Sequence, residues 1–397
     1  MIGRSPATDV AIVGGGIIGA ASAAFLAAAG VRVTLYERAD IAAAASGRNS
    51  GVIQHPFDPV LVALYRESLA LYRELASVSA GAFRFGDEPA GLLMIGPGEE
   101  AAAAAKIADA WADTYPGARP EIVAGGSLRD LEPALAPDLV ACRLAIGYPV
   151  APGSATRAYA RLAEARGATI RLGADVALAL DGDIAVGVLV DGRLQPAGAV
   201  LVAAGPWSPA LLDPTGDWQP IRGIWGVIAQ LDLPDAPRHV VEEFEIDIEP
   251  TSEPTEPAEA DEDDGLGFSL ITADGASALG STFLEDEPQP DAFAAGLRER
   301  GSRYLPAIAT APLVSLRACA RPVALDGRPL VGAVPGIDRA FVAAGNGPWG
   351  ISTGPGTARL IADLALGRGV SVPAALDPAR FGRVTPAIAR QRDPLPG

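Results

Sequence analysis

Three glycines near the start of the chain have the spacing of a dinucleotide-binding turn. Gly14, Gly16 and Gly19 follow the pattern G-x-G-x-x-G directly after a short apolar run. In such a turn the first glycine makes the bend, the second leaves room for a pyrophosphate and the third lets a helix pack on the strand. The helix would begin with Ile17 and Ile18, so that its positive N-terminal end faces the phosphates.

An acid stands where such a unit binds an adenosine ribose. Glu37 ends the apolar segment 31–36, 18 residues after Gly19, and Arg38 follows it as a second expected contact. A carboxylate at this place accepts hydrogen bonds from both ribose hydroxyls and disfavours a 2′-phosphate. The strand, the glycines, the helical segment 17–29 and the terminal acid together predict a dinucleotide-binding βαβ unit. They leave NAD and FAD open, and a glycine-rich turn in another α/β domain is the alternative.

A polar loop follows the second predicted strand and reads IAAAASGRNSG over residues 41–51. Its hydroxyls and backbone amides suit an anionic or polar ligand, whereas an ordinary surface loop is the alternative. The residues expected to contact the cofactor here are Ser46, Gly47, Arg48, Asn49, Ser50, Gly51 and Val52. His55 follows, and we treat it as a candidate for the pocket wall beside the cofactor, against the alternative of a buried structural histidine.

Two further segments are predicted to return to the same sheet. Residues 199–204 form a buried strand whose end, Ala204, is followed by Gly205 and Trp207, and the glycine permits a close backbone approach. A hairpin is predicted over 176–190 with its turn at Asp181 and Gly182. We expect Val176, Ala204, Gly205 and Trp207 to contact the cofactor.

The composition bounds the class of protein. The chain has 397 residues, 49% of them hydrophobic, which is enough for a large core in one or two domains. Its net charge of −17 disfavours nucleic acids and anionic membranes as partners. We expect no membrane span, because no apolar run is long enough, and a cytoplasmic location, because the segment before the first strand is too short for a signal peptide. No metal site is predicted, because Cys142 and Cys319 are the only cysteines.

One segment differs from the rest in composition. Residues 242–264 carry twelve acidic residues interspersed with prolines. Such a composition cannot bury enough apolar surface to order itself, which predicts a solvated, disordered insertion. The alternatives are an active-site lid and a docking segment for a basic partner.

The order of the motifs resembles a known family. The first fingerprint is followed by the SGRNSG loop, the LVAAGPWS strand end, the RP…DGRPLVG segment and the block AAGNGPWGISTGPGTARLIADL. Together they resemble the FAD-dependent amine and amino-acid oxidoreductases, which include D-amino-acid oxidases and dehydrogenases, glycine oxidase and monomeric sarcosine oxidase. The resemblance spans nearly the whole chain and implies FAD rather than NAD as the cofactor.

The resemblance implies an α/β fold with two interleaved domains and the active site at their junction. A Rossmann-like FAD-binding domain is expected from residues 1–82, 146–220 and 317–380. An α+β substrate domain with a mostly antiparallel sheet is expected from residues 83–145 and 221–316.

The last glycine-rich block is implied to end in a helix that begins near 351–354 and runs to residue 366. The positive N-terminal end of this helix would stabilise the anion that reduced flavin becomes. The cofactor contacts expected there are Gly347, Pro348, Trp349, Gly350, Ile351, Ser352 and Thr353. Trp349, like Trp225 and Tyr148, is also a candidate pocket wall.

Two residues near position 320 receive roles from the resemblance. Arg321 stands in the Arg-Pro pair that binds the substrate carboxylate in glycine-oxidase-like members, and a planar guanidinium suits that target. A structural ion pair is the alternative. Cys319 stands about where monomeric sarcosine oxidase attaches flavin covalently, although glycine-oxidase-like members have glycine there, and a small buried residue is the alternative. Ala278 replaces the lysine that activates oxygen in sarcosine oxidase, which leaves O2 and another electron acceptor open.

These features predict an enzyme that oxidises the C–N bond of a small amino acid or N-methylated amino acid. Arg321 would anchor the carboxylate while a neutral amine directs its C–H bond at flavin N5 for hydride transfer, giving an imine that hydrolyses. One alternative is a flavin dehydrogenase acting on a 2-hydroxy acid or another non-amine donor. A non-catalytic FAD-binding protein that recruits a partner is the other. The substrate and the oligomeric state are left open.

Overall fold

The first of two eight-stranded sheets contains the predicted dinucleotide-binding unit. The computed structural model describes residues 8–244 and 265–385. In spatial order the strands are β17 (Leu330–Ala333), β18 (Ala340–Ala344), β11 (Arg193–Val202), β1 (Thr8–Val13), β2 (Val33–Tyr36) and β8 (Thr169–Arg171), with β10 (Ile184–Val190) and β9 (Val176–Asp181) attached to β11. The run from β18 to β8 is parallel, so its carboxyl ends share one edge.

Helices rich in small residues cover this sheet. The helices are α1 (Ile17–Ala28), α3 (Pro59–Val78), α6 (Ser154–Ala165) and α9 (Gly350–Ala365), with the short α2 (Ala45–Arg48) and α7 (Ser208–Leu212) at its edge. α1 packs against α6 and α9, and α3 packs against α9. The alanines of α1 allow this close packing, and Ala20, Ala21, Ala23 and Ala24 are fully buried.

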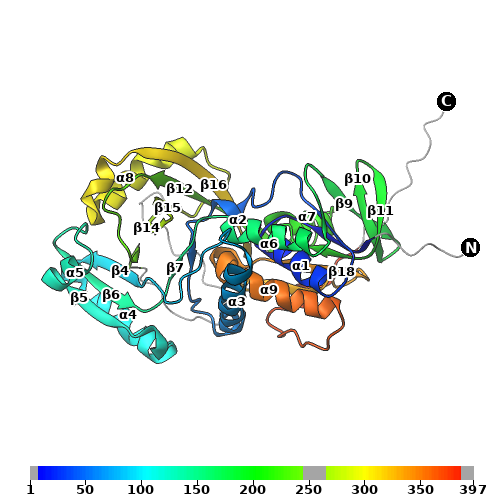
Figure 1. Cartoon of the computed structure of the whole chain (residues 1–397), viewed down its shortest axis with the longest axis horizontal. Helices are drawn as coiled ribbons and strands as arrows, with labels where there is room; N and C mark the ends of the chain where they lie inside the picture. The colour runs from blue at the N-terminus through cyan, green and yellow to red at the C-terminus, as the bar shows by residue number, and fades with distance from the viewer. Residues whose placement is uncertain (1–7, 245–264, 386–397) are drawn as a thin grey trace, which may run out of the picture.

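The second sheet is almost entirely antiparallel. In spatial order its strands are β16 (Leu313–Ala324), β12 (Ile221–Leu231), β15 (Ala276–Thr282), β14 (Leu266–Ala273), β13 (Val240–Glu243), β4 (Leu92–Pro97), β6 (Leu139–Leu144) and β5 (Glu121–Ala124). Its helices are α4 (Ala101–Thr114), α5 (Gly125–Leu131) and α8 (Ala294–Tyr304). A small sheet of β3 (Val52–Ile53) and β7 (Tyr148–Pro149) completes the strands described. The second sheet and its helices lie at the left of Figure 1, and β9 to β11 and β18 lie at the right.

The sequence predictions agree with this mixed α/β architecture, with two differences. The predicted boundary between residues 316 and 317 falls inside β16, which pairs with β12 along its length and so belongs to the second sheet. The predicted disordered insertion begins too early, because Glu242 and Glu243 are strand residues that pair with Met94 and Ile95 of β4. Phe244, the next residue, is also described, and residues 245–264 of that insertion lie outside the described residues.

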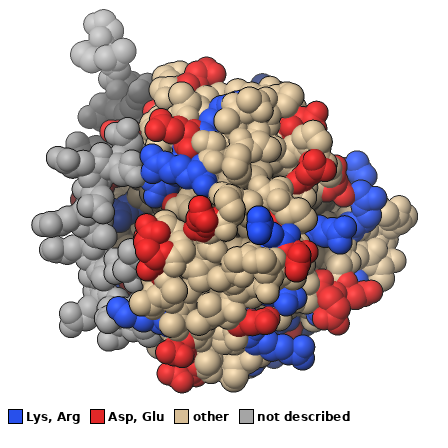
Figure 2. Space-filling model, turned by 90° about the vertical axis from the view of Figure 1, so that its left-hand side faces the viewer, with Lys and Arg blue, Asp and Glu red and all other residues tan. Residues whose placement is uncertain are grey.

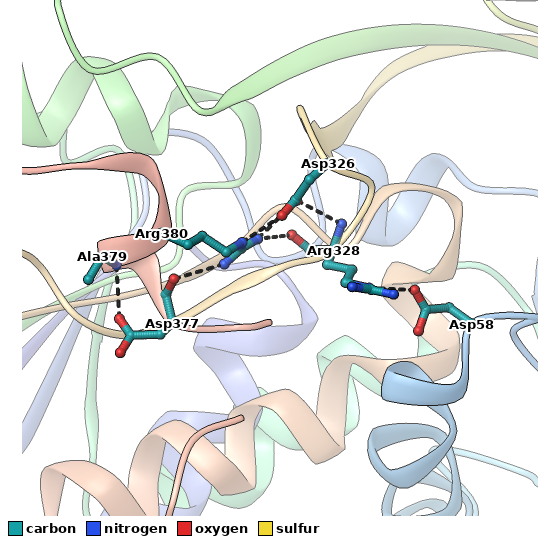
Figure 3. A network of polar contacts seen from close by, with 6 residues as sticks. All are labelled: Asp58, Asp326, Arg328, Asp377, Ala379 and Arg380. Carbon is teal, nitrogen blue, oxygen red and sulfur yellow. Dashed lines mark hydrogen bonds and ion pairs between the residues drawn. The ribbon is translucent and has the colours of Figure 1, made fainter. Parts of the chain in front are cut away.

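A polar network joins the start of α3 to the segment after β16. Arg328 Nε donates to Asp58 Oδ2 over 2.7 Å, while the other oxygen of Asp58 accepts from the Val60 amide and caps α3. Arg380 donates to both carboxylate oxygens of Asp326. Figure 3 shows these two contacts meeting at the turn that carries Asp326 and Arg328. The network therefore ties three distant parts of the chain together.

The end of the molecule that carries α4, α5 and α8 shows acidic and basic side chains interspersed (Figure 2). Neither sign dominates among the described residues that this view shows. Within the described residues, no helix has the length and apolar character that crossing a bilayer requires.

Candidate active site

A cavity of about 790 Å³ lies where the carboxyl ends of the parallel strands of the first sheet meet the second sheet. The ends of β1, β2, β11 and β18 supply one wall, and β12 to β16 supply the other. Ligands of open α/β sheets bind outside the carboxyl ends of the strands. The cavity is therefore at the place where a dinucleotide is expected.

The predicted turn has the backbone form that only glycine permits without strain. Gly14 has a φ of +111°, and a Cβ there would lie 2.8 Å from the carbonyl carbon of Ala203. A Cβ at Gly19 would overlap the carbonyl oxygen of Gly14, so Gly19 serves helix packing rather than the cavity wall. Gly16 is the N-cap of α1, which has neither a side-chain cap nor an acid in its first turn. That helix end is therefore suited to phosphate oxygens.

Glu37 holds the end of β2 against this turn. Its Oε2 accepts from the Gly15 amide over 2.7 Å and its Oε1 accepts from the Ala39 amide over 2.9 Å. A carboxylate has about four lone-pair sites, so acceptor capacity remains for ribose hydroxyls. Beside it, the Arg38 guanidinium lies 4.1 Å from the centre of the Trp207 ring. All three side chains line the cavity, at the end of β2 where the adenosine of a dinucleotide is expected.

The polar loop packs against both the turn and β16. Ser46 Oγ accepts from the Ile17 amide over 2.9 Å, and Arg48 donates to the carbonyl of Ala318. Arg317 returns a hydrogen bond to the carbonyl of Asn49. The loop is thereby fixed between the turn and β16, where it lines the cavity.

Asn346 provides an independent test of whether the cavity fits a bound group. Its Nδ2 donates to Thr353 and Thr357 of α9, which fixes the amide. Its Oδ1 is buried and has no hydrogen-bond partner among the described residues. A buried acceptor of this kind needs a donor, and Asn346 lines the cavity. The residues present therefore fit a cofactor that carries hydrogen-bond donors.

Arg321 reaches into the cavity from β16. Its Nη1 donates to the carbonyl of Thr282 over 2.8 Å, its Nη2 donates to Ser281 Oγ, and its Cζ lies 4.6 Å from the centre of the Phe283 ring. Burial lowers the pKa of Arg321, yet no carboxylate of the described residues pairs with it. The guanidinium is thus a partly buried cation that lines the cavity.

Cys319 lines the same wall and is buried. Burial raises the pKa of its thiol, an effect that the nearby Arg321 and Arg317 oppose. The thiol is therefore protonated at neutral pH. Cys319 lines the cavity in which the cofactor is expected, and both its contact with the cofactor and its bonding to flavin stay predictions.

His55 lies away from the cavity wall. It is 2% exposed, stacks on Tyr115 with ring centres 4.0 Å apart, and meets the edges of Tyr65 and Trp111. Burial, assisted by the charge of Arg66, lowers its pKa to about 4. The structure thus favours the alternative of a buried structural histidine, which is neutral at pH 7.

The structure brings most of the predicted site residues to one cavity. Those that line it are Gly14, Gly16, Ile17, Ile18, Glu37, Arg38, Ser46, Arg48, Asn49, Ser50, Val52, Val176, Ala204, Gly205, Trp207, Trp225, Cys319, Arg321, Gly347, Pro348, Trp349, Gly350, Ile351 and Ser352. Predicted residues outside the wall are Gly19, Gly47, Gly51, His55, Tyr148 and Thr353. Gly47 and Gly51 instead make room for the backbone of Ala42 and Val150.

Sequence reasoning missed several cavity residues, some on or beside strands of the second sheet and others after β3 and β18. They are Gln54, Phe57, Met94, Glu242, Glu243, Phe268, Ser281, Phe283 and Asn346. Of these residues, only Asn346 could have been found from the sequence, because it stands inside the glycine-rich block before α9. Glu243 accepts from Arg300 Nε, Tyr304 and the Phe268 amide, so it is a strand acid held by partners.

Comparisons with known proteins agree with this geometry. The model of the FAD dependent oxidoreductase family matches residues 9–364. A glycine oxidase of Pseudomonas aeruginosa is 27% identical over 382 residues, covering 90% of this chain and 95% of its own. A D-amino acid dehydrogenase of Methylobacterium radiotolerans is 28% identical over 230 residues, covering 57% of this chain and 51% of its own. A glycine oxidase structure from Geobacillus kaustophilus has a TM-score of 0.77 at 25% identity and covers 96% of this chain and 99% of that chain.

The family match extends over most of the chain, and the fold is that of solved glycine oxidases. Both findings confirm the predicted fold class and cofactor. The protein is an enzyme that belongs to the family of FAD-dependent oxidoreductases.

Proposed function

We propose that this enzyme oxidises the C–N bond of a small amino acid or N-methylated amino acid that carries a free carboxylate. One observation carries the proposal: Arg321 is a partly buried guanidinium that lines the cavity and has no carboxylate partner among the described residues. A guanidinium binds a carboxylate through two parallel hydrogen bonds. Arg321 would therefore bind and orient the acid end of the substrate.

The relatives support an amine rather than a 2-hydroxy acid as the donor. They are named as glycine oxidase and D-amino acid dehydrogenase, whose substrates are amino acids. A 2-hydroxy acid would use the same guanidinium, so it is kept as an outcome of the test. The family assignment removes the non-catalytic alternative.

The residues of the chain would act by binding, orientation and exclusion of water. Bound FAD supplies a two-electron acceptor at the cavity. None of the described residues that line the cavity is a histidine or a lysine, so the substrate amine must reach its neutral form without a base of those types. Apolar side chains of Trp225, Met94 and Phe283 favour that neutral form by desolvation. The imine product would then hydrolyse in water.

The first test is the absorbance of purified holoenzyme during anaerobic addition of glycine, sarcosine, D- and L-amino acids and 2-hydroxy acids. Bleaching of the flavin by an amino acid supports the proposal. Bleaching by 2-hydroxy acids alone, or by none of these donors, contradicts it. Colour that stays in the acid-precipitated pellet would indicate a covalent bond, for which Cys319 is the candidate.

Substitution of Arg321 by methionine tests the assigned role directly. Loss of a charge-assisted hydrogen-bond pair of about 3 kcal/mol corresponds to a KM increase of roughly 100-fold for the amino acid. Arg222→Met is the matched control, because Arg222 lies on the adjacent β12, is half exposed and pairs only loosely with Glu285. An unchanged KM in Arg321→Met would refute the carboxylate role.

A further inference from the structure

We infer that Gly226 is a positioning residue for Arg321, because its missing side chain leaves the space in which the guanidinium crosses β12. The inference rests on the proposed function and extends it to a residue that contacts neither substrate nor cofactor through a side chain. In the second sheet, β12 lies between β16 and β15.

The side chain of Arg321 spans a neighbouring strand. Arg321 belongs to β16, and the carbonyl that accepts its Nη1 belongs to Thr282 at the end of β15. Neighbouring strands lie about 4.8 Å apart, so β16 and β15 are about 10 Å apart with β12 between them. The guanidinium must therefore lie across the backbone of β12.

The crossing point is Gly226. In the β12–β16 register Arg321 is opposite Ile224, whereas Gly226 is opposite Cys319. The guanidinium nevertheless lies above Gly226, where a Cβ would be 2.6 Å from both Cζ and Nη1 of Arg321. The side chain thus leans along the strand into the space left by the missing side chain of Gly226.

The backbone gives no other reason for glycine at this position. Gly226 is not among the glycines with positive φ, so alanine can adopt its conformation. The atoms that a methyl group would meet are the far end of a flexible side chain, which can move. Alanine at 226 is therefore expected to leave the strand intact and displace the guanidinium.

The displaced guanidinium would lose its present anchors. Two of its five N–H groups donate to Thr282 and Ser281, and the Phe283 ring lies beside it. These contacts hold the plane of the guanidinium and leave three N–H groups for a ligand. A shift away from Gly226 breaks both bonds and changes the direction of the remaining donors.

The test compares Gly226→Ala with wild type as holoenzyme. We expect KM for an amino-acid substrate to rise roughly tenfold to 100-fold, with kcat changed less than about threefold. Acetate binding, measured through the change that acetate causes in the flavin absorbance, should weaken by the same factor. Gly223→Ala is the control, because a Cβ there meets Ala320 and Pro206 rather than Arg321; it should leave both quantities near their wild-type values.

A double-mutant cycle separates positioning from a general structural effect. In the Arg321→Met background, Gly226→Ala should add no further loss of acetate binding, because the side chain it displaces is absent. The inference is overturned if wild type and Gly226→Ala bind acetate equally well. It is also overturned if Gly226→Ala weakens acetate binding as much in the Arg321→Met background as it does in wild type. Should no amino acid reduce the wild-type flavin, the proposed function fails, while the acetate measurements still decide the role of Gly226.

Discussion

His55 should make the protein less stable as the pH falls below neutrality. Its ring is buried among Tyr65, Trp111 and Tyr115, and its two nitrogens have no hydrogen-bond partner among the described residues. Burial lowers its pKa from 6.5 to about 4. The folded state therefore resists a proton that the unfolded state binds readily.

The direction and magnitude of this pH effect on the free energy of unfolding follow from the shift in the pKa of His55. Because the folded pKa is the lower one, the stability is complete above pH 6.5 and is lost progressively as the pH falls towards 4. The full shift corresponds to a ceiling of roughly 3 kcal/mol, of which about 1 to 2 kcal/mol is lost between pH 7 and pH 5.

The assay is denaturant unfolding of wild type and His55→Phe at pH 7 and pH 5, with saturating FAD. Phenylalanine keeps an aromatic ring against Tyr115 and removes the titrating imidazole. The contributions of all other titrating groups then cancel in the comparison. The free energy of unfolding of wild type relative to the variant should fall by about 1 to 2 kcal/mol at the lower pH. A difference independent of pH would refute this account of His55.

Two further substitutions test the cavity wall formed by the first sheet and the polar network of Figure 3. Glu37→Gln should weaken FAD binding about tenfold, measured by flavin fluorescence, because the amide accepts more weakly from Gly15 and from ribose; an unchanged affinity would remove Glu37 from the site. Asp58→Ala should lower the free energy of unfolding by about 1 to 2 kcal/mol through the lost helix cap and ion pair. A double-mutant cycle with Arg328→Ala should give a coupling of no more than about 1 kcal/mol, and additivity would show that the ion pair contributes nothing.

The cavity wall formed by the first sheet could be predicted because the sequence patterns that indicate it are local. The turn at Gly14, the helix after it and the acid at Glu37 lie within thirty residues, and each needs a particular residue type. The hairpin turn at Gly182, which has a φ of +64°, was read from the chain in the same way. Such features depend on backbone geometry that a short sequence pattern encodes.

The second wall was not predictable because it depends on pairing between distant strands. Glu242 and Glu243 stand at the start of an acidic run, and their place in a strand depends on parallel pairing with β4, about 150 residues earlier. His55 follows the cofactor loop directly, but aromatic residues of α3 and α4 enclose it. Neither the partner strand nor the enclosing rings are visible in the local sequence.

The strand order of the first sheet has a consequence for synthesis. The neighbours of β1 include β11, and β11 in turn needs β18, which ends at Ala344. The nascent chain therefore carries its nucleotide fingerprint for about three hundred residues before the sheet can close, and α9 with its cavity residues emerges later still. FAD capture is thus expected to be post-translational, and ribosome-released fragments that end before β18 should remain unable to retain the cofactor.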